Sequence, residues 1–175
     1  MRLDGSGSVH VNGFNRFGEA GPVWSPTRYE VAFQAGPTDG SSLSVYVVRA
    51  DGRRKRRLAV GQNPSWSSDG RRLAFIDDCR LFTIGENGKG KRRVSREGEF
   101  VVGAVWSPKG GTLAVVAGTT ADCYGGAAGN LRVETVSADG KRMHVLAREP
   151  ADSFILGPPV WTPDGKRILV AIDTD

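Results

Sequence analysis

Short apolar runs separated by polar turns make up most of the chain. Residues of strand type, β-branched or aromatic and often at alternating positions, recur in these runs, which is typical of half-buried strands. The runs are Tyr29–Gln34, Arg72–Ile76, Thr112–Ala117 and Arg167–Ile172, then Leu43–Val48, Arg80–Ile84 and Leu131–Val136, then the more basic Lys55–Val60, Lys91–Val94 and Arg142–Ala147. Since no segment has a long helical period, we expect an all-β chain.

Pairs of aspartate or asparagine with glycine mark the points where one expected strand ends and the next begins. Such pairs favour type I′ hairpin turns, in which both central residues adopt positive φ. They occur early in a unit at Asp69-Gly70 and Asp164-Gly165, and late in a unit at Asp51-Gly52, Asn87-Gly88 and Asp139-Gly140. The predicted order is strand, turn, strand, loop, strand, turn, strand.

All four tryptophans of the chain occur in one repeated segment. The copies are Pro22–Pro26, Pro64–Gly70, Ala104–Gly110 and Pro159–Gly165, so that Trp24, Trp66, Trp106 and Trp161 follow one another at spacings of 42, 40 and 55 residues. A four-stranded propeller blade takes about 40–45 residues, and the last spacing adds an insertion. The repeat therefore predicts a β-propeller of about four antiparallel four-stranded blades, with units starting near residues 22, 64, 104 and 159.

The repeated segments resemble the TolB-type WD-like repeat over most of the chain, from about Pro22 to Asp173. The resemblance rests on Trp161–Arg167, Leu73–Phe75, Ala50–Gly52 and Arg56–Leu58, which recur in register in other units. The first unit departs from the pattern, because Thr27-Arg28 stands where Asp-Gly is usual. The resemblance implies a bacterial envelope or other extracytoplasmic setting, although Met1–Gly5 has no apolar signal-peptide region and a leader could precede this sequence.

The ends of the chain leave three arrangements open. Met1–Asn12 resembles the tail of a blade, and Pro159–Asp173 supplies the first two strands of one. The two could form a split blade that closes a ring, the chain could be part of a larger ring, or two chains could share one ring. Exposed strand edges favour self-association in the open arrangements.

The net charge of +5 is concentrated in basic runs at one place in the repeat. Arg53–Arg57, Lys91–Arg93 and Lys141-Arg142 all precede an outermost strand, where basic side chains discourage edge-to-edge pairing. Binding of single-stranded nucleic acid also favours interleaved exposed aromatics, and none lie near these runs. We therefore expect no nucleic-acid partner, and no apolar stretch approaches the length of a membrane span.

Residues that could carry chemistry are sparse, and we expect no catalytic residue, cofactor or metal. His10 and His144 fall in outermost strands, Asp77 and Asp78 offer too few ligands for Ca²⁺, and no serine lies in a Gly-x-Ser-x-Gly elbow. Cys79 and Cys123 precede the third strand of consecutive blades and could be bridged or be two free thiols. We expect the four tryptophans to pack between blades rather than to form a ligand cage.

Long loops are the remaining candidates for function. Ala35–Ser42, Gly118–Asn130 and Glu149–Gly157 would emerge on one face of a propeller. There we expect a protein or peptide partner to bind, although the insertion could also be neutral. The candidate residues are Thr119, Thr120, Asp122, Tyr124, Phe154 and Ile155. The prediction is a binding scaffold; the alternatives are an accessory propeller of a peptidase or carbohydrate-active enzyme, and a purely structural assembly domain.

Overall fold

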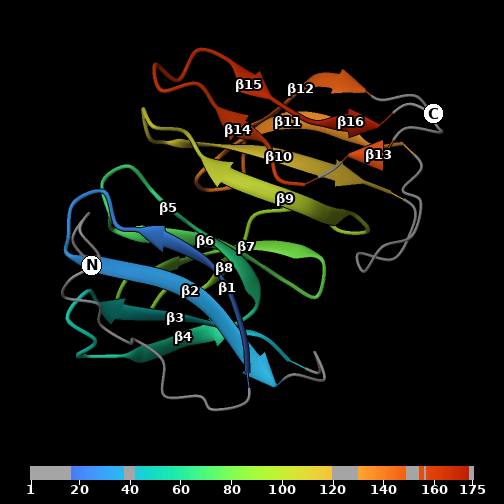
Figure 1. Ribbon diagram of the computed structural model, residues 1–175. Helices are drawn as coiled ribbons and strands as arrows, with labels where there is room; N and C mark the ends of the chain where they lie inside the picture. The colour runs from blue at the N-terminus through green and yellow to red at the C-terminus, as the bar shows by residue number, and fades with distance from the viewer. Residues whose placement is uncertain (1–16, 38–41, 120–129, 149–153, 156, 174–175) are drawn as a thin grey trace.

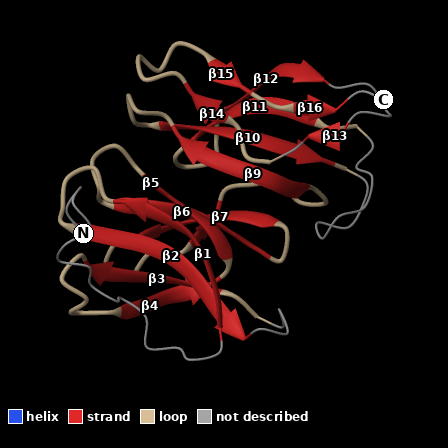
Figure 2. Cartoon of the chain, in the orientation of Figure 1, coloured by secondary structure: helices blue, strands red, loops and turns tan. Residues whose placement is uncertain are grey.

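The computed structural model describes residues 17–37, 42–119, 130–148, 154–155 and 157–173, and within these ranges every regular element is a β-strand (Figure 1). Figure 2 shows the same chain coloured by strand and loop. The strands form three four-stranded antiparallel sheets and, near the C-terminus, two small two-stranded ones. The expected all-β class of repeated four-stranded antiparallel sheets is confirmed.

Each four-stranded sheet, called a blade from here on, is a meander in which strands consecutive in sequence pair as neighbours. The first blade consists of β1 (Phe17–Trp24), β2 (Glu30–Pro37), β3 (Ser44–Arg49) and β4 (Arg56–Val60). The second consists of β5 (Gln62–Trp66), β6 (Arg72–Asp77), β7 (Arg80–Gly85) and β8 (Arg92–Arg93). The third consists of β9 (Phe100–Trp106), β10 (Thr112–Gly118), β11 (Arg132–Ser137) and β12 (Met143–Arg148).

The last blade contains two strands, each of which is divided into two short segments. β13 (Phe154–Ile155) pairs with β16 (Ile172–Asp173), and β14 (Val160–Trp161) pairs with β15 (Ile168–Leu169). β14, β15 and β16 lie within Pro159–Asp173, where two strands were expected, whereas β13 lies in the segment Glu149–Gly157 that was expected to be a loop. The expected blade tail, Met1–Asn12, lies outside the described residues.

The first strands of successive blades lie side by side. β5 contacts β1 of the preceding blade and β9 of the following one, and Figure 1 shows the first three blades arranged one after another. Each of these three strands ends in a tryptophan, so the arrangement brings Trp24, Trp66 and Trp106 toward one region of the molecule.

The core lies between the blades, and the second and third blades pack both of their faces against neighbours. In β6, Leu73 and Phe75 belong to the cluster shared with the first blade, whereas Ala74 and Ile76 belong to the cluster shared with the third. This explains why the second strands read as nearly continuous apolar runs: in β10, every residue from Leu113 to Gly118 is buried. The expectation of half-buried strands is therefore wrong for these central strands.

The Asp-Gly turns differ from the expected type I′ geometry. Only the glycines adopt positive φ, for example 65° at Gly70 and 73° at Gly140, whereas Asp69 and Asp139 do not. The Gly70 N–H donates to the carbonyl of Ser67 at 2.8 Å, so glycine occupies the fourth position of the turn and not a central one. Type I turns favour glycine at that position, and only one left-handed residue is needed.

A hairpin with two left-handed central residues occurs instead between β6 and β7. Asp77 pairs with Arg80, and the two residues between them, Asp78 and Cys79, have φ of 47° and 60°. Two positive φ values are the signature of a type I′ turn. Neither residue is glycine, so this tight turn carries backbone strain that Asp-Gly sequences avoid.

Candidate functional site

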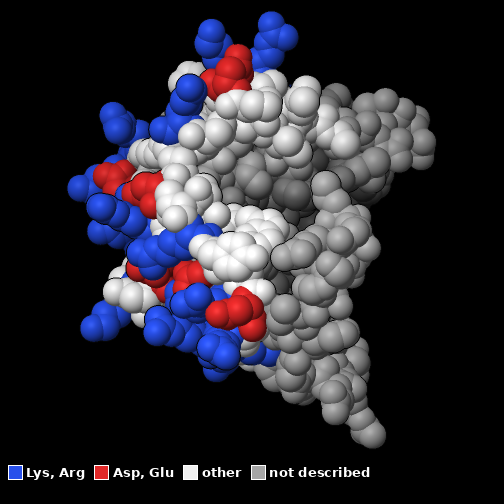
Figure 3. All heavy atoms as spheres, turned by 60° about the vertical axis from the view of Figure 1, so that its left-hand side comes forward, with Lys and Arg blue, Asp and Glu red and all other residues white. Residues whose placement is uncertain are grey.

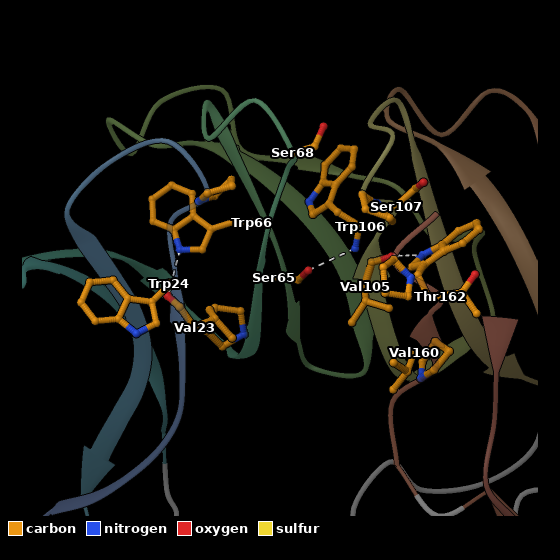
Figure 4. Close-up of a pocket in the computed structure, with 16 residues that line it drawn as sticks. Val23, Trp24, Ser65, Trp66, Ser68, Val105, Trp106, Ser107, Val160 and Thr162 are labelled. Carbon is orange, nitrogen blue, oxygen red and sulfur yellow. Dashed lines mark hydrogen bonds between the residues drawn. The ribbon is translucent and has the colours of Figure 1, made fainter. Parts of the chain in front are cut away.

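A pocket of about 510 Å³, called the tryptophan pocket from here on, is built by the four tryptophan segments (Figure 4). It is formed by the ends of β1, β5, β9 and β14 and by the turns that follow them. The lining residues are Val23, Trp24, Pro26, Pro64, Ser65, Trp66, Ser68, Val105, Trp106, Ser107, Pro108, Pro159, Val160, Trp161, Thr162 and Pro163.

Hydrogen bonds between blades fix two of the indoles. The Nε1–H of Trp66 donates to the carbonyl of Val23 at 3.2 Å, and the Nε1–H of Trp161 donates to the carbonyl of Val105 at 3.2 Å. Val23 and Val105 each directly precede the tryptophan of the blade before, so the bond repeats the same relationship (Figure 4). A buried indole N–H normally finds a partner, and here that partner is the neighbouring blade.

Trp106 is held differently. Its main-chain N–H donates to Ser65 Oγ at 3.1 Å, while its indole Nε1 is buried without an acceptor among the described residues. The guanidinium of Arg72 lies over its ring at 5.7 Å from the centroid. Trp66 and Trp106 are 7% and 6% exposed, whereas Trp24, in the first blade, is 60% exposed.

The turns beside the pocket are pinned by a repeated hydroxyl–carboxylate bond. Ser67 donates to Asp69 and Thr162 donates to Asp164, both at 2.6 Å, and Ser137 and Asp139 repeat the bond away from the pocket. This hydrogen bond, followed by one from a main-chain N–H two residues on, holds the pKa of each of the three aspartates below its ordinary value. Acceptance of hydrogen bonds by the charged form is the physical cause.

The pocket is uncharged. None of its described lining residues is acidic or basic, and Figure 3 shows Lys and Arg gathered along one side of the molecule. The polar side-chain groups of its described lining are hydroxyls and indole N–H groups, and the hydroxyls of Ser65 and Ser107 accept main-chain N–H groups. The site therefore suits apolar, uncharged groups.

The residues expected to bind a partner lie at the opposite ends of the strands or outside the described part. Thr119 is exposed and follows β10, whose other end pairs Leu113 with Trp106. Phe154 and Ile155 form β13. Thr120, Asp122 and Tyr124 lie outside the described residues, so this binding site remains a prediction.

A buried ionic network escaped the sequence analysis. Arg132 contacts Glu99 at 2.6 Å and Glu134 at 3.1 Å, and Arg96 contacts both carboxylates at 3.1 and 3.3 Å. Burial opposes the charge on Arg132, but hydrogen bonds and attraction from the two carboxylates outweigh it and raise its pKa. Two cations balance two anions, which marks the network as structural.

The basic runs are largely engaged within the fold. Lys55 lies over the rings of Phe33 and Tyr46 at 5.4 and 5.3 Å, and Lys91 lies 4.4 Å from the ring centroid of Phe82. Cation–π contacts of this kind stabilise exposed sites modestly. The repetition in two blades favours the structural interpretation of these runs.

Arg56 connects the first two blades. Its guanidinium contacts Glu30 at 3.1 Å and Glu86 at 3.5 Å, and Arg28 adds a second contact to Glu86 at 2.5 Å. Arg56 on the outer strand β4 and Arg28 in the turn between β1 and β2 therefore both take part in contacts between blades.

The histidines and cysteines are placed as follows. His144 is exposed on the outermost strand β12, and His10 lies outside the described residues. Cys79 is in a disulfide bond. The chain has one other cysteine, Cys123, which lies outside the described residues. The sequence left two alternatives for the cysteines, a bridge or free thiols, and Cys79 is bridged.

No three His, Cys, Asp or Glu side chains in the described ranges gather closely enough to hold a metal ion. In the same part of the chain, no helix has the length and apolar character needed to cross a membrane.

Comparison with solved structures identifies the fold. The structure superposes on a protein assigned as TolB from Agrobacterium tumefaciens with a TM-score of 0.67 at 21% identity, covering 85% of this chain. TolB from Acinetobacter baumannii gives a TM-score of 0.66 at 17% identity, covering 90% of this chain. The β-propeller domain of the trilobed protease from Pyrococcus furiosus, described as having an open velcro topology, gives 0.64 at 11% identity, covering 89% of this chain. The chain has a β-propeller fold.

The propeller spans only part of these structures. It covers 56% of the Agrobacterium protein, 38% of the Acinetobacter TolB and 48% of the Pyrococcus domain. No family model matches the sequence, and no curated protein matches it either. The resemblance to TolB propeller domains is therefore structural.

Proposed function

We propose that this propeller is a non-catalytic scaffold that binds an uncharged, proline-rich segment of a partner protein in the tryptophan pocket. The observation that carries the proposal is the pocket of about 510 Å³, whose described lining contains four indoles and no charged residue. Ligand sites are generally apolar hollows of about 300–1,000 Å³ with a few placed polar groups.

A proline-rich peptide suits this lining for two reasons. Grooves lined by aromatic rings bind polyproline II segments, because the pyrrolidine rings pack on the aromatic faces. Such segments are also extended before they bind, so little conformational entropy is lost. A charged segment would lose its hydration in the pocket without gaining a partner of opposite charge.

The pocket is also preformed. The indoles of Trp66 and Trp161 are fixed by hydrogen bonds to the preceding blade, and the turns after them are fixed by Asp69 and Asp164. A site that is rigid before binding avoids the cost of ordering side chains. The sequence also contains no Gly-x-Ser-x-Gly elbow, which supports binding rather than hydrolysis.

Two matched variants test which end of the propeller binds. Fluorescence polarisation of a fluorescein-labelled decaproline peptide would measure affinity for the wild type, Pro108→Glu and Thr119→Glu. Pro108 is an exposed residue of the pocket lining, and Thr119 is an exposed residue of the loop-rich face. We expect Pro108→Glu to weaken binding by about tenfold or more, because a carboxylate enters an apolar site, and Thr119→Glu to leave it unchanged.

Two results would contradict the pocket as the site. One is loss of affinity in Thr119→Glu with normal affinity in Pro108→Glu, which would assign binding to the loop-rich face. The other is no binding of decaproline to the wild type at millimolar concentration. Thermal unfolding of both variants controls for loss of the fold.

The alternative function is that of an accessory propeller in a peptidase or carbohydrate-active enzyme. The similarity to the propeller domain of the Pyrococcus protease favours this candidate, although at such identity it concerns the fold alone. An α/β catalytic domain joined to this propeller in the full-length gene, with peptide turnover, would support it.

The disulfide at Cys79 supports an extracytoplasmic setting for the scaffold. Disulfides persist in oxidising compartments and are rare in reducing ones. Fractionation of expressing cells, with the protein recovered outside the cytoplasm, is the expected result.

A further inference from the structure

The two end blades of the chain expose matching apolar surfaces. In the first blade, Trp24 and Tyr29 are 60% and 70% exposed, and their rings lie 5.7 Å apart. In the last blade, Val160 and Leu169 are 58% and 61% exposed and pair side by side across β14 and β15. We call these surfaces the head (Trp24, Tyr29) and the tail (Val160, Leu169); Trp24 and Val160 also line the tryptophan pocket, so a docked copy and a bound peptide would compete for these two residues.

The tail corresponds to surfaces of the first and third blades that are covered by the blade that follows each of them. Val160 and Leu169 occupy the register positions of Val23↔Ala32 in the first blade and Val105↔Ala114 in the third. Ala32 and Ala114 are both completely buried. Among the described residues, the valine–leucine pair of the last blade therefore lacks the cover that its counterparts have.

The head contains the tryptophan that corresponds to the covering tryptophans of the second and last blades. Trp66 and Trp161 reach back to the preceding blade and donate their indole N–H to Val23 and Val105. Trp24 holds the same position in its own segment, but it is largely exposed. The carbonyl of Val160 is the acceptor that continues the series.

We propose that a second copy of this chain docks head to tail, with Trp24 of one copy packed on Val160 and Leu169 of the other. The indole N–H of Trp24 then donates to the carbonyl of Val160, as Trp66 and Trp161 do within the chain. Arg167 of the other copy covers the indole, because it occupies the position from which Arg72 covers Trp106. The contact repeats an interface that the chain already forms internally.

A second copy fits this surface because each chain carries both halves of the contact. An interface between two different patches of identical chains is heterologous, and it closes into a ring or continues as a filament according to its rotation. Single exposed apolar residues are ordinary on proteins, whereas exposed apolar side chains grouped into a patch mark interaction surfaces.

Sedimentation velocity over a range of concentrations tests the contact with three variants of the full chain. Trp24→Ala removes the head, Leu169→Glu disrupts the tail, and Leu146→Glu is a matched control, because Leu146 is 49% exposed on the outer strand β12. We expect the wild type and Leu146→Glu to self-associate. We expect each end variant to raise the dissociation constant roughly thirtyfold or more, as loss of a central interface anchor does.

Mixing the two end variants gives the most specific readout. Trp24→Ala keeps an intact tail and Leu169→Glu keeps an intact head, so an equimolar mixture should form a one-to-one dimer that neither variant forms alone. A monomeric wild type at every concentration would overturn the proposal. So would end variants that associate like the wild type, or a mixture that stays monomeric. Circular dichroism of each variant shows whether the fold is kept.

Discussion

The indole N–H of Trp66 donates to the main-chain carbonyl of Val23, 43 residues earlier in the sequence, at 3.2 Å. The bond joins corresponding segments of two consecutive blades, and Trp161 repeats it on Val105. A side chain repeated for packing therefore also sets the spacing between blades, and the same indoles line the tryptophan pocket.

The hydrogen bond of Trp66 should be measurable by comparing two phenylalanine variants. Trp66→Phe and Trp106→Phe remove similar volume from buried sites, but only the first removes an indole hydrogen bond, since Nε1 of Trp106 has no acceptor among the described residues. We expect Trp66→Phe to lower the free energy of unfolding by about 1 kcal/mol more than Trp106→Phe. Equal losses in urea unfolding would show that the bond contributes nothing.

Acid should destabilise the blade turns through their aspartates. The pKa of Asp69 is lowered in the folded state, chiefly by the hydroxyl of Ser67 and then by the N–H of Arg71. A lowered folded pKa adds stability above the unfolded value of about 3.8, and this stability is lost as pH falls through the folded pKa. Urea unfolding of the wild type and Asp69→Asn between pH 6 and pH 2 checks this: the variant should be less stable at pH 6, and the difference should disappear at the acid end.

Removal of Arg132 should be among the most damaging single changes. It is 3% exposed and neutralises Glu99 and Glu134, so Arg132→Ala leaves two carboxylates with Arg96 alone. Breaking a buried ion pair costs about 3–5 kcal/mol. Arg80→Ala is the control, because its pair with Asp78 is exposed and such pairs contribute about 0–1 kcal/mol. Similar unfolding free energies for both variants would contradict the assignment.

The bridged state of Cys79 predicts a thiol count. No free cysteine is found among the described residues, and the chain has two cysteines in all. We expect no reaction with a thiol reagent in denatured, unreduced protein and complete reaction after reduction. Two reactive thiols before reduction would show that the bridge does not form.

The strand order and the repeat could be predicted from the sequence because both depend on local patterns. The tryptophan spacing and the positions of glycine indicated where each blade begins and turns. The turn type was wrong, because Asp69-Gly70 was assigned to the two central positions, whereas the Ser67 carbonyl accepts from Gly70 and puts glycine one position later. The burial of both faces of β10 could not be predicted either, because it results from packing of the neighbouring blades and not from the local alternation of apolar and polar residues.

The sites depended on residues far apart in the sequence. Arg132 and Glu134 stand two residues apart on one strand, which the sequence shows. The charge balance of the buried network also requires Glu99, which directly precedes a different strand. The tryptophans were expected to pack between blades, but the pocket that they line requires the four segments to converge. The exposure of Trp24 follows from its place in the first blade, which its local sequence does not distinguish from the other copies.

Exchange of the four indole N–H protons with deuterium, followed by NMR, tests the central claim most directly. The claim is that the tryptophan segments join consecutive blades through their indoles. In the Leu169→Glu background, where the head stays uncovered, the account predicts slow exchange at Trp66 and Trp161 and fast exchange at Trp24. Fast exchange at all four indoles would contradict it.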